Sequence, residues 1–224
     1  MIGLLGGTGD LGTALAMHIA RAYDVVYLGS RSREKAESAV RELIAEKLAG
    51  TSYESHLIPT MNEEVVMKSD VIIATVPYES AIETIRALVP KFRGNQILIS
   101  AAALVRKIVE IGEFKGPTAD SRPLAIQIRE VVPSSVKVAA GFQTVPANVL
   151  YKDRDNQTFD VLIASEDAET FSKVSAFVNS LKGLRALSIG SLGQAGEVEG
   201  LTSILLNIAI KNKLKSPTFR VESF

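Results

Sequence analysis

Short apolar runs alternate with longer amphipathic segments along most of this chain. Runs such as MIGLL, DVVYLG and DVIIATVP are rich in valine, isoleucine and leucine, and turn-forming residues bound them. Such runs are typical of strands in a parallel sheet that is covered on both faces. The alternation therefore predicts an α/β fold with a doubly wound, mostly parallel sheet and right-handed crossovers.

The expected elements follow in chain order. We expect strands at MIGLL, DVVYLG, SHLIP, DVIIATVP, QILISAAA, VKVAAGF, DVLIAS and LRALSIG. We expect helices near residues 11–22, 32–49, 62–69, 78–91, 122–131 and 167–182, and a last, strongly apolar helix within 193–214. The glycine- and proline-containing segment 112–123 predicts a surface loop. We divide the chain into a sheet domain, residues 1–190, and a small C-terminal helical segment, residues 191–224.

The balance of charges and the lack of cysteine narrow the classes of function. Lysine plus arginine equals aspartate plus glutamate, at 25 residues each, which argues against a nucleic-acid-binding protein and against attachment to acidic membranes by charge. Without cysteine there is no disulfide and no cysteine-bound zinc, and two histidines are too few for a histidine-rich metal site. No apolar run reaches the about 18 residues of a membrane helix. The first residues read as a strand and not as a leader, so we expect a cytoplasmic protein.

Residues Gly7-Thr8-Gly9-Asp10-Leu11-Gly12 fit the pattern G-x-G-x-x-G between the first strand and the first helix. In this context the first glycine permits a tight turn, the second lets a pyrophosphate approach the backbone, and the third lets helix and strand pack closely. The positive end of the helix then favours phosphate. The pattern indicates a dinucleotide site, and the alternative is a tight turn without a ligand. For Asp10 we expect a helix cap, because a carboxylate repels phosphate.

A basic cluster after the second strand indicates which nucleotide binds. NAD-preferring domains carry an acidic residue at this point for the ribose 2′-hydroxyl, but the strand ends in the residues YLGSR. Arg31 offers a planar guanidinium for a 2′-phosphate, Ser30 adds a hydroxyl, and Lys35 adds a second positive charge. The cluster therefore favours NADP over NAD. The alternative is a solvated helix start with salt bridges to nearby glutamates, and we accept that interpretation for Arg33.

Three further segments end strands at the edge where open α/β sheets bind ligands. Val76-Pro77-Tyr78 brings backbone near the expected nicotinamide ribose, and Tyr78 either lines the pocket or packs on the next helix. The small side chains after Ser100 either leave room for a flat ring or reflect close packing of a loop. Gln143 and Thr144 either hydrogen-bond an amide or carbonyl of a ligand or satisfy their own loop.

Two acid–base patterns that dehydrogenases use are missing from their expected places. No tyrosine has a lysine four residues later, and the pairs Lys91/Asn95 and Lys152/Asn156 fall at a helix end and in a loop. We expect packing roles for His18 and His56. We therefore assign no catalytic residue and no metal ligand. Hydride transfer to an acceptor that needs little proton chemistry, such as a flavin-like ring, fits this pattern because positioning supplies much of the rate.

The motifs LLGGTGDLG, LGSRSREKA, TVPYESAI, QTVPA and GLRALSIGSL…EGLTSILLNIAI occur in this order over almost the whole chain. Together they resemble the NADPH-dependent F420 reductases, also called F420H2:NADP oxidoreductases. The resemblance implies a Rossmann-type domain, a small C-terminal portion and a homodimer. It also implies direct hydride transfer between C4 of the nicotinamide of NADP and C5 of the deazaflavin coenzyme F420, the co-substrate.

The resemblance also implies contacts. Those with NADP are Thr8, Gly9, Asp10, Leu11, Ser30, Arg31, Lys35, Val76, Ala101 and Ala147. The deazaflavin would lie against the nicotinamide, between the loop after the sixth strand and the C-terminal segment, near Gln143, Thr144, Leu206 and Asn207. Residues 191–224 would complete that site and supply the dimer contact. Two other functions stay open: NADPH-dependent reduction of a flavin, ferric chelate or small carbonyl or imine, and non-enzymatic sensing of NADP.

Overall fold

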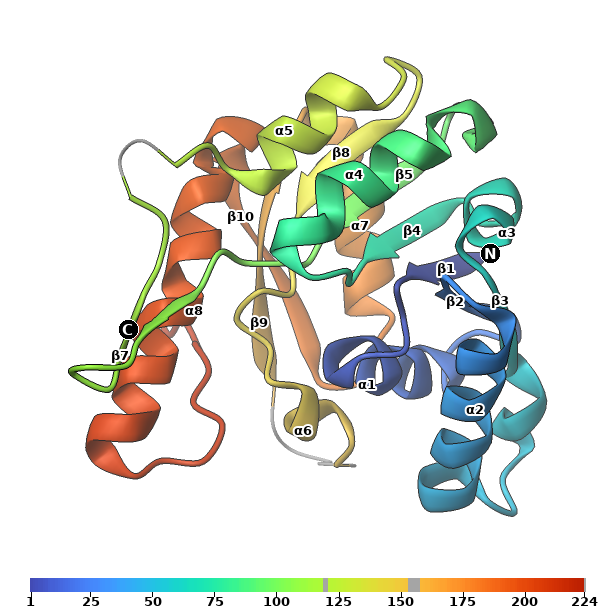
Figure 1. Ribbon diagram of the computed structural model, residues 1–224, viewed down its shortest axis with the longest axis horizontal. Helices are drawn as coiled ribbons and strands as arrows, with labels where there is room; N and C mark the ends of the chain where they lie inside the picture. Colours follow the sequence, from blue (N-terminus) through green and yellow to red (C-terminus); the bar gives the residue numbers. More distant parts are fainter. Residues whose placement is uncertain (119–120, 153–157, 224) are drawn as a thin grey trace.

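The computed structural model of the protein describes residues 1–118, 121–152 and 158–223. In these ranges the main sheet has eight strands in the order β10-β9-β8-β5-β4-β1-β2-β3 (Figure 1). Neighbours from β8 to β3 pair in parallel, β9 is antiparallel to β8, and β10 is parallel to β9. The strands are β1 (Ile2–Leu5), β2 (Val26–Ser30), β3 (Leu57–Met61), β4 (Val71–Ala74), β5 (Ile97–Ser100), β8 (Lys137–Ala140), β9 (Phe159–Ser165) and β10 (Leu184–Ser191). The predicted doubly wound, mostly parallel sheet is confirmed.

Helices cover both faces of this sheet. One face packs against α1 (Asp10–Ala20), α2 (Arg33–Leu43) and α7 (Ala168–Asn179). The other packs against α3 (Asn62–Lys68), α4 (Tyr78–Leu88) and α5 (Leu124–Val131). The remaining helices are α6 (Ala147–Leu150) and α8 (Ala195–Asn212), with short turns η1 (Ile44–Leu48), η2 (Ser52–His56), η3 (Val89–Lys91) and η4 (Leu192–Gln194). None of the helices in the described ranges is long and apolar enough to cross a membrane.

The central strands are buried because their side chains meet helices on both sides. Every residue of β1 and β5 is buried, as expected for strands that read as continuous apolar runs. On one face Leu15 and Ile19 of α1 are fully buried, and on the other Ile85 of α4 and Ile128 of α5 are fully buried. The sheet is therefore a rigid support for the loops at its carboxyl edge, where ligands of such folds bind.

The structure differs from the expected elements mainly in residues 106–115, and it adds the short helix α6. Segment 112–123, expected to be a surface loop, contains β7 (Glu113–Lys115), which pairs antiparallel with β6 (Arg106–Ile108). Three-residue strands are too short to show an alternating apolar pattern, so the sequence carries no signal for them. This two-stranded ribbon lies beside α8 (Figure 1).

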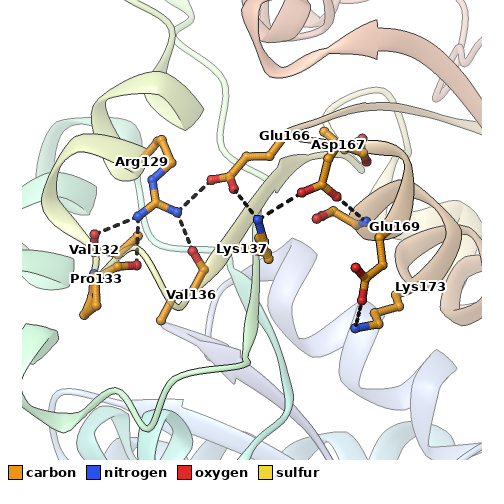
Figure 2. A network of polar contacts seen from close by, with 11 residues as sticks. Arg129, Val132, Pro133, Val136, Lys137, Glu166, Asp167, Glu169 and Lys173 are labelled. Carbon is orange, nitrogen blue, oxygen red and sulfur yellow. Dashed lines mark hydrogen bonds and ion pairs between the residues drawn. The ribbon is translucent and has the colours of Figure 1, made fainter.

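A network of ions fastens the antiparallel strand β9 to the rest of the sheet (Figure 2). Glu166, just after β9, pairs with Arg129 of α5 at 2.7 Å and with Lys137 of β8 at 3.6 Å. Lys137 also pairs with Asp167 at 2.9 Å. Arg129 donates to the backbone carbonyls of Val132, Pro133 and Val136. The network lies at the amino end of β8, away from the carboxyl edge.

Candidate active site

The glycine turn joins β1 to α1 at the carboxyl edge of the sheet. The Gly7 amide donates to the Gly29 carbonyl at 2.8 Å, which ties the turn to β2. A Cβ on Gly12 would lie 2.5 Å from the Gly7 carbonyl oxygen, so only glycine permits this approach of helix to turn. A Cβ on Gly9 would meet nothing within 4 Å. The turn therefore leaves open space at the N-terminus of α1, where a pyrophosphate fits.

Asp10 has a different place from the one expected. Gly9 is the N-cap residue of α1, and Asp10 is the first helical residue. The Gly9 carbonyl accepts hydrogen bonds from the Thr13 amide at 2.9 Å and the Thr13 hydroxyl at 3.0 Å. The predicted Asp10 cap is therefore wrong, because the cap position precedes it. Its exposed side chain instead lines the cavities on both sides of the glycine turn.

The basic cluster lies at the end of β2, beside the glycine turn. Ser30 is buried, and Arg31 and Lys35 are exposed and form no ion pair within the described ranges. Ser30 and Arg31 line a cavity of about 350 Å³. Arg33 is exposed and pairs with Glu64, which fits the solvated interpretation for that arginine. The Lys68 ammonium and the Arg33 guanidinium lower the pKa of Glu64 to about 2.

A second, larger cavity of about 530 Å³ opens on the other side of the turn. Its lining comes from the loop after β8, α6, α8 and the chain after α8, and includes Asp10, Gln143, Thr144, Ala147, Tyr151, Thr202, Leu205, Leu206, Ala209, Ser216 and Pro217. The Gln143 amide nitrogen donates to the Ser100 carbonyl at 2.8 Å. Gln143 Oε1 and Thr144 Oγ1 are buried and have no hydrogen-bond partner in the part of the chain that the structure describes. The mostly apolar lining of this cavity suits a flat ring.

Comparisons with known proteins indicate the same family. The family described as "NADP oxidoreductase coenzyme F420-dependent" matches residues 1–104. The F420-dependent NADP reductase of Methanocaldococcus jannaschii is 31% identical, over 98% of this chain and 97% of its own length. That of Methanothermobacter marburgensis is 30% identical with the same coverage. The chain belongs to the F420-dependent NADP reductase family.

A solved structure shows the same fold as this member of the family. It is a protein from Arthrobacter sp. FB24, provisionally assigned as an F420-dependent NADP reductase, with a TM-score of 0.77 and 17% identity over 99% of both chains. Residues 1–104 of the family match include the glycine turn and the basic cluster. The residues of the larger cavity lie mostly beyond residue 104, and the alignments with the two full-length reductases include that part of the chain.

Several other residues considered for the site pack against the protein itself. Val76 is buried beside Gly6, and Ala101 is buried where its amide donates to the Ala74 carbonyl at 3.1 Å. Leu11 packs partly against the core. Tyr78 hydrogen-bonds the Arg122 carbonyl at 3.2 Å, which fits the packing alternative.

Asn207 does not line the larger cavity. Its side-chain amide exchanges two hydrogen bonds with the backbone of Phe114, each of 2.7 Å. Both ends of the amide are therefore engaged, and the structure gives Asn207 a role in holding the β6–β7 ribbon instead of an acceptor contact.

The two histidines have backbone partners. His18 Nε2 lies 2.8 Å from the Lys182 carbonyl, and His56 Nδ1 lies 2.7 Å from the Ala20 carbonyl. These contacts fit the expected packing roles. The described residues contain no cluster of three or more acidic or histidine side chains that could hold a metal ion.

Sequence reasoning missed residues that shape the site. Asn62 Oδ1 accepts a hydrogen bond from the Gly6 amide at 3.1 Å, and a polar residue directly after β3 was a usable signal. Thr202 of α8 donates to the Gln143 carbonyl at 3.0 Å. The chain after α8 contributes Ser216 and Pro217 to the cavity.

Glu199 fixes the position of α8 relative to the cavity. Its carboxylate is fully buried and accepts hydrogen bonds from the Leu124 amide at 3.0 Å and the Ala125 amide at 3.2 Å, at the N-terminus of α5. Burial raises the pKa of the Glu199 carboxyl to about 7, although the two amides act in the opposite direction. No signal in the sequence distinguished this glutamate from a surface residue.

Proposed function

We propose that this protein transfers a hydride directly between NADP(H) and coenzyme F420. The carrying observation is the cavity of about 530 Å³ that adjoins the glycine turn through Asp10 and is lined by Gln143 and Thr144 from the loop after β8. The names of its full-length relatives support the same pair of substrates.

The nucleotide end of the site fits NADP. The free amides of the glycine turn would bind the pyrophosphate, and the space that a Cβ on Gly9 would fill is open. Arg31 would bind the 2′-phosphate with its planar guanidinium, with Ser30 and Lys35 beside it. Because Arg31 and Lys35 have no ion-pair partner in the described ranges, a phosphate would not have to displace a carboxylate from them.

The larger cavity would hold the two rings. Gln143 and Thr144 would lie beside the nicotinamide. Their side-chain oxygens are buried, so they would have to turn toward the cavity to hydrogen-bond the carboxamide. Leu205 and Leu206 also line the cavity and offer apolar side chains against which a deazaflavin ring would stack. The bound nicotinamide and deazaflavin would supply the hydride chemistry, in either direction. The protein's part would be to hold the two rings face to face and to exclude water.

We also propose that residues 191–224 complete the acceptor site and supply a homodimer contact. Ile204, Ile208 and Ile210 of α8 are exposed, as are Val109 and Ile111 at the tip of the adjacent ribbon. Exposed apolar side chains on neighbouring elements mark an interaction surface. Light scattering at micromolar concentration should give twice the chain mass, and a monomer would contradict the dimer.

The test of the function is a hydride-transfer assay with four substrate pairs. The purified protein is mixed with NADPH or NADH and with F420 or free flavin, and the deazaflavin and nicotinamide absorbances are followed together. We expect rapid, NADPH-specific reduction of F420 with equal amounts of NADPH consumed. Binding of NADPH without reduction of F420 would contradict the proposal and direct attention to flavin, ferric-chelate and carbonyl acceptors.

A further inference from the structure

The chain after α8, residues 213–221, forms a defined segment that we name the C-terminal tail. Lys213 and Ser216 have left-handed backbone conformations, with φ of 54° and 57°. The Leu214 amide donates to the Ala209 carbonyl at 2.9 Å and closes the helix. The two conformations reverse the chain, so that the tail runs back beside α8 (Figure 1).

Hydrogen bonds hold the tail against the cavity loop and the sheet. The Thr218 hydroxyl donates to the Thr144 carbonyl at 2.9 Å, and Ser216 contacts Asn148. Further along, the Val221 amide donates to Asp160 Oδ2 at 2.5 Å and its carbonyl accepts from Arg185 at 2.6 Å. The Asp160 carboxylate is fully buried and also pairs with the Arg185 guanidinium at 2.7 Å. The tail is therefore a fixed wall beside the cavity.

Two lysines of the tail lie next to the mouth of the cavity. Lys213 is the left-handed residue that directly follows α8, between the lining residues Ala209 and Ser216 in the sequence. Lys215 directly precedes Ser216, another lining residue. Both lysines are exposed, and neither forms an ion pair within the described ranges. Two positive charges at this mouth thus lack an acidic partner in that part of the chain.

The chemistry of the acceptor gives these charges a use. A deazaflavin ring in the apolar cavity must direct its side chain outward, and the side chain of F420 carries a phosphodiester and glutamate carboxylates. We propose that the C-terminal tail binds this anionic side chain, with Lys213 and Lys215 as its cationic contacts. The inference rests on the proposed function. Exposed lysines attract an anionic ligand at long range and form ion pairs with it, and added salt weakens both effects.

The test compares binding of two deazaflavins to the variant Lys213→Ala/Lys215→Ala. One ligand is F420, and the other is the neutral deazaflavin that lacks the phosphate and glutamates; both are followed by ring fluorescence. We expect the Kd for F420 to rise about fivefold at low salt, as for two exposed ion pairs, and less at high salt. The Kd values for the neutral deazaflavin and for NADPH should not change.

The matched control is Lys68→Ala/Lys173→Ala, which removes two exposed lysines that pair with Glu64 and Glu169 outside the cavity lining. It should leave the Kd for F420 as in the wild type. Unchanged F420 binding in the tail variant, or an equal loss for the neutral ligand, would overturn the inference. F420 that binds with the expected lysine dependence but is not reduced would overturn the proposed function alone. A wild type that does not bind F420 would overturn both.

Discussion

Asn207 of α8 hydrogen-bonds both backbone groups of Phe114 in β7. Its Nδ2 donates to the Phe114 carbonyl, and its Oδ1 accepts from the Phe114 amide, each at 2.7 Å. One side-chain amide thus takes the place of a neighbouring strand on the open edge of the ribbon. The ion pair between Lys211 and Glu113 at 3.0 Å adds a second link between the same elements.

Replacing Asn207 should therefore loosen the ribbon without affecting nucleotide binding. In Asn207→Ala the partly buried Phe114 amide and carbonyl lose their partners, and each net hydrogen bond is worth about 1 kcal/mol. We expect the free energy of unfolding to fall by about 2 kcal/mol and the Phe114 amide to exchange faster. Urea unfolding and hydrogen exchange measure the two effects.

Asn212→Ala is the matched control on the same helix, because among the described residues the exposed Asn212 amide donates only to the Ile208 carbonyl of its own helix. It should change the unfolding free energy by less than about 0.5 kcal/mol. If the two variants exchange at Phe114 at the same rate, the ribbon does not depend on Asn207.

Local patterns in the sequence were sufficient for the fold and for the placement of the glycine turn beside the basic cluster. Apolar runs set the strands, and the order of glycine turn and basic cluster placed Gly9 and Arg31 at neighbouring strand ends. These features depend on residues within about 25 positions of one another and on the known packing of parallel strands.

Contacts between distant segments could not be predicted in the same way. Glu199 reaches the amide of Leu124, and Thr218 reaches the carbonyl of Thr144, each across more than 70 residues. The resemblance assigned both Leu206 and Asn207 to the acceptor, but adjacent helical residues face different directions. Only the path of the ribbon shows that the Asn207 side chain hydrogen-bonds the backbone of Phe114.

Arg31 should determine the preference for NADPH. Its guanidinium is free of ion pairs in the described ranges, and a charged hydrogen bond to phosphate is worth about 1.5–3 kcal/mol. Arg31→Ala should therefore raise the Kd for NADPH by at least about tenfold and leave the weaker binding of NADH nearly unchanged. Isothermal calorimetry with both nucleotides measures this difference.

Arg33→Ala provides the comparison, because Arg33 is two residues away but pairs with Glu64. It should leave the ratio of the two affinities near the wild-type value. Equal losses of NADPH and NADH affinity in Arg31→Ala would instead indicate damage to the turn and no 2′-phosphate contact.

Glu199 should make stability depend on pH. Burial raises the pKa of its carboxyl from 4.5 in the unfolded chain to about 7 in the folded protein. Between these values the folded state keeps a proton that the unfolded state has released, so the free energy of unfolding falls as pH rises and levels off above about 7. The loss is at most about 3 kcal/mol, at 1.36 kcal/mol per pKa unit.

Glu199→Gln removes the titration but keeps an oxygen that can accept from the α5 amides. The difference in unfolding free energy between this variant and the wild type should shift in favour of the variant as pH rises from 4.5 to 7.5. Denaturant unfolding at several pH values measures it. Parallel stability curves would show that Glu199 ionises in the folded protein as it does in the unfolded chain.

Gly9 and Gly12 should respond to alanine in opposite ways, although both belong to one motif. A Cβ at Gly12 would lie 2.5 Å from the Gly7 carbonyl oxygen, so Gly12→Ala must push α1 away from the turn and cost about 1–3 kcal/mol of stability. A Cβ at Gly9 meets nothing within 4 Å, and its φ of −85° suits alanine. Gly9→Ala should therefore fold with nearly wild-type stability.

NADPH binding distinguishes the role of Gly9 from that of Gly12. The open space beside Gly9 is where the pyrophosphate would approach the backbone, so Gly9→Ala should weaken NADPH binding at least about tenfold, since a methyl group there displaces the phosphates from the amides. Thermal unfolding and NADPH titration of both variants measure stability and affinity independently. A Gly9→Ala protein that binds NADPH as tightly as the wild type would show that the nucleotide lies elsewhere, even if Gly12→Ala loses stability as expected.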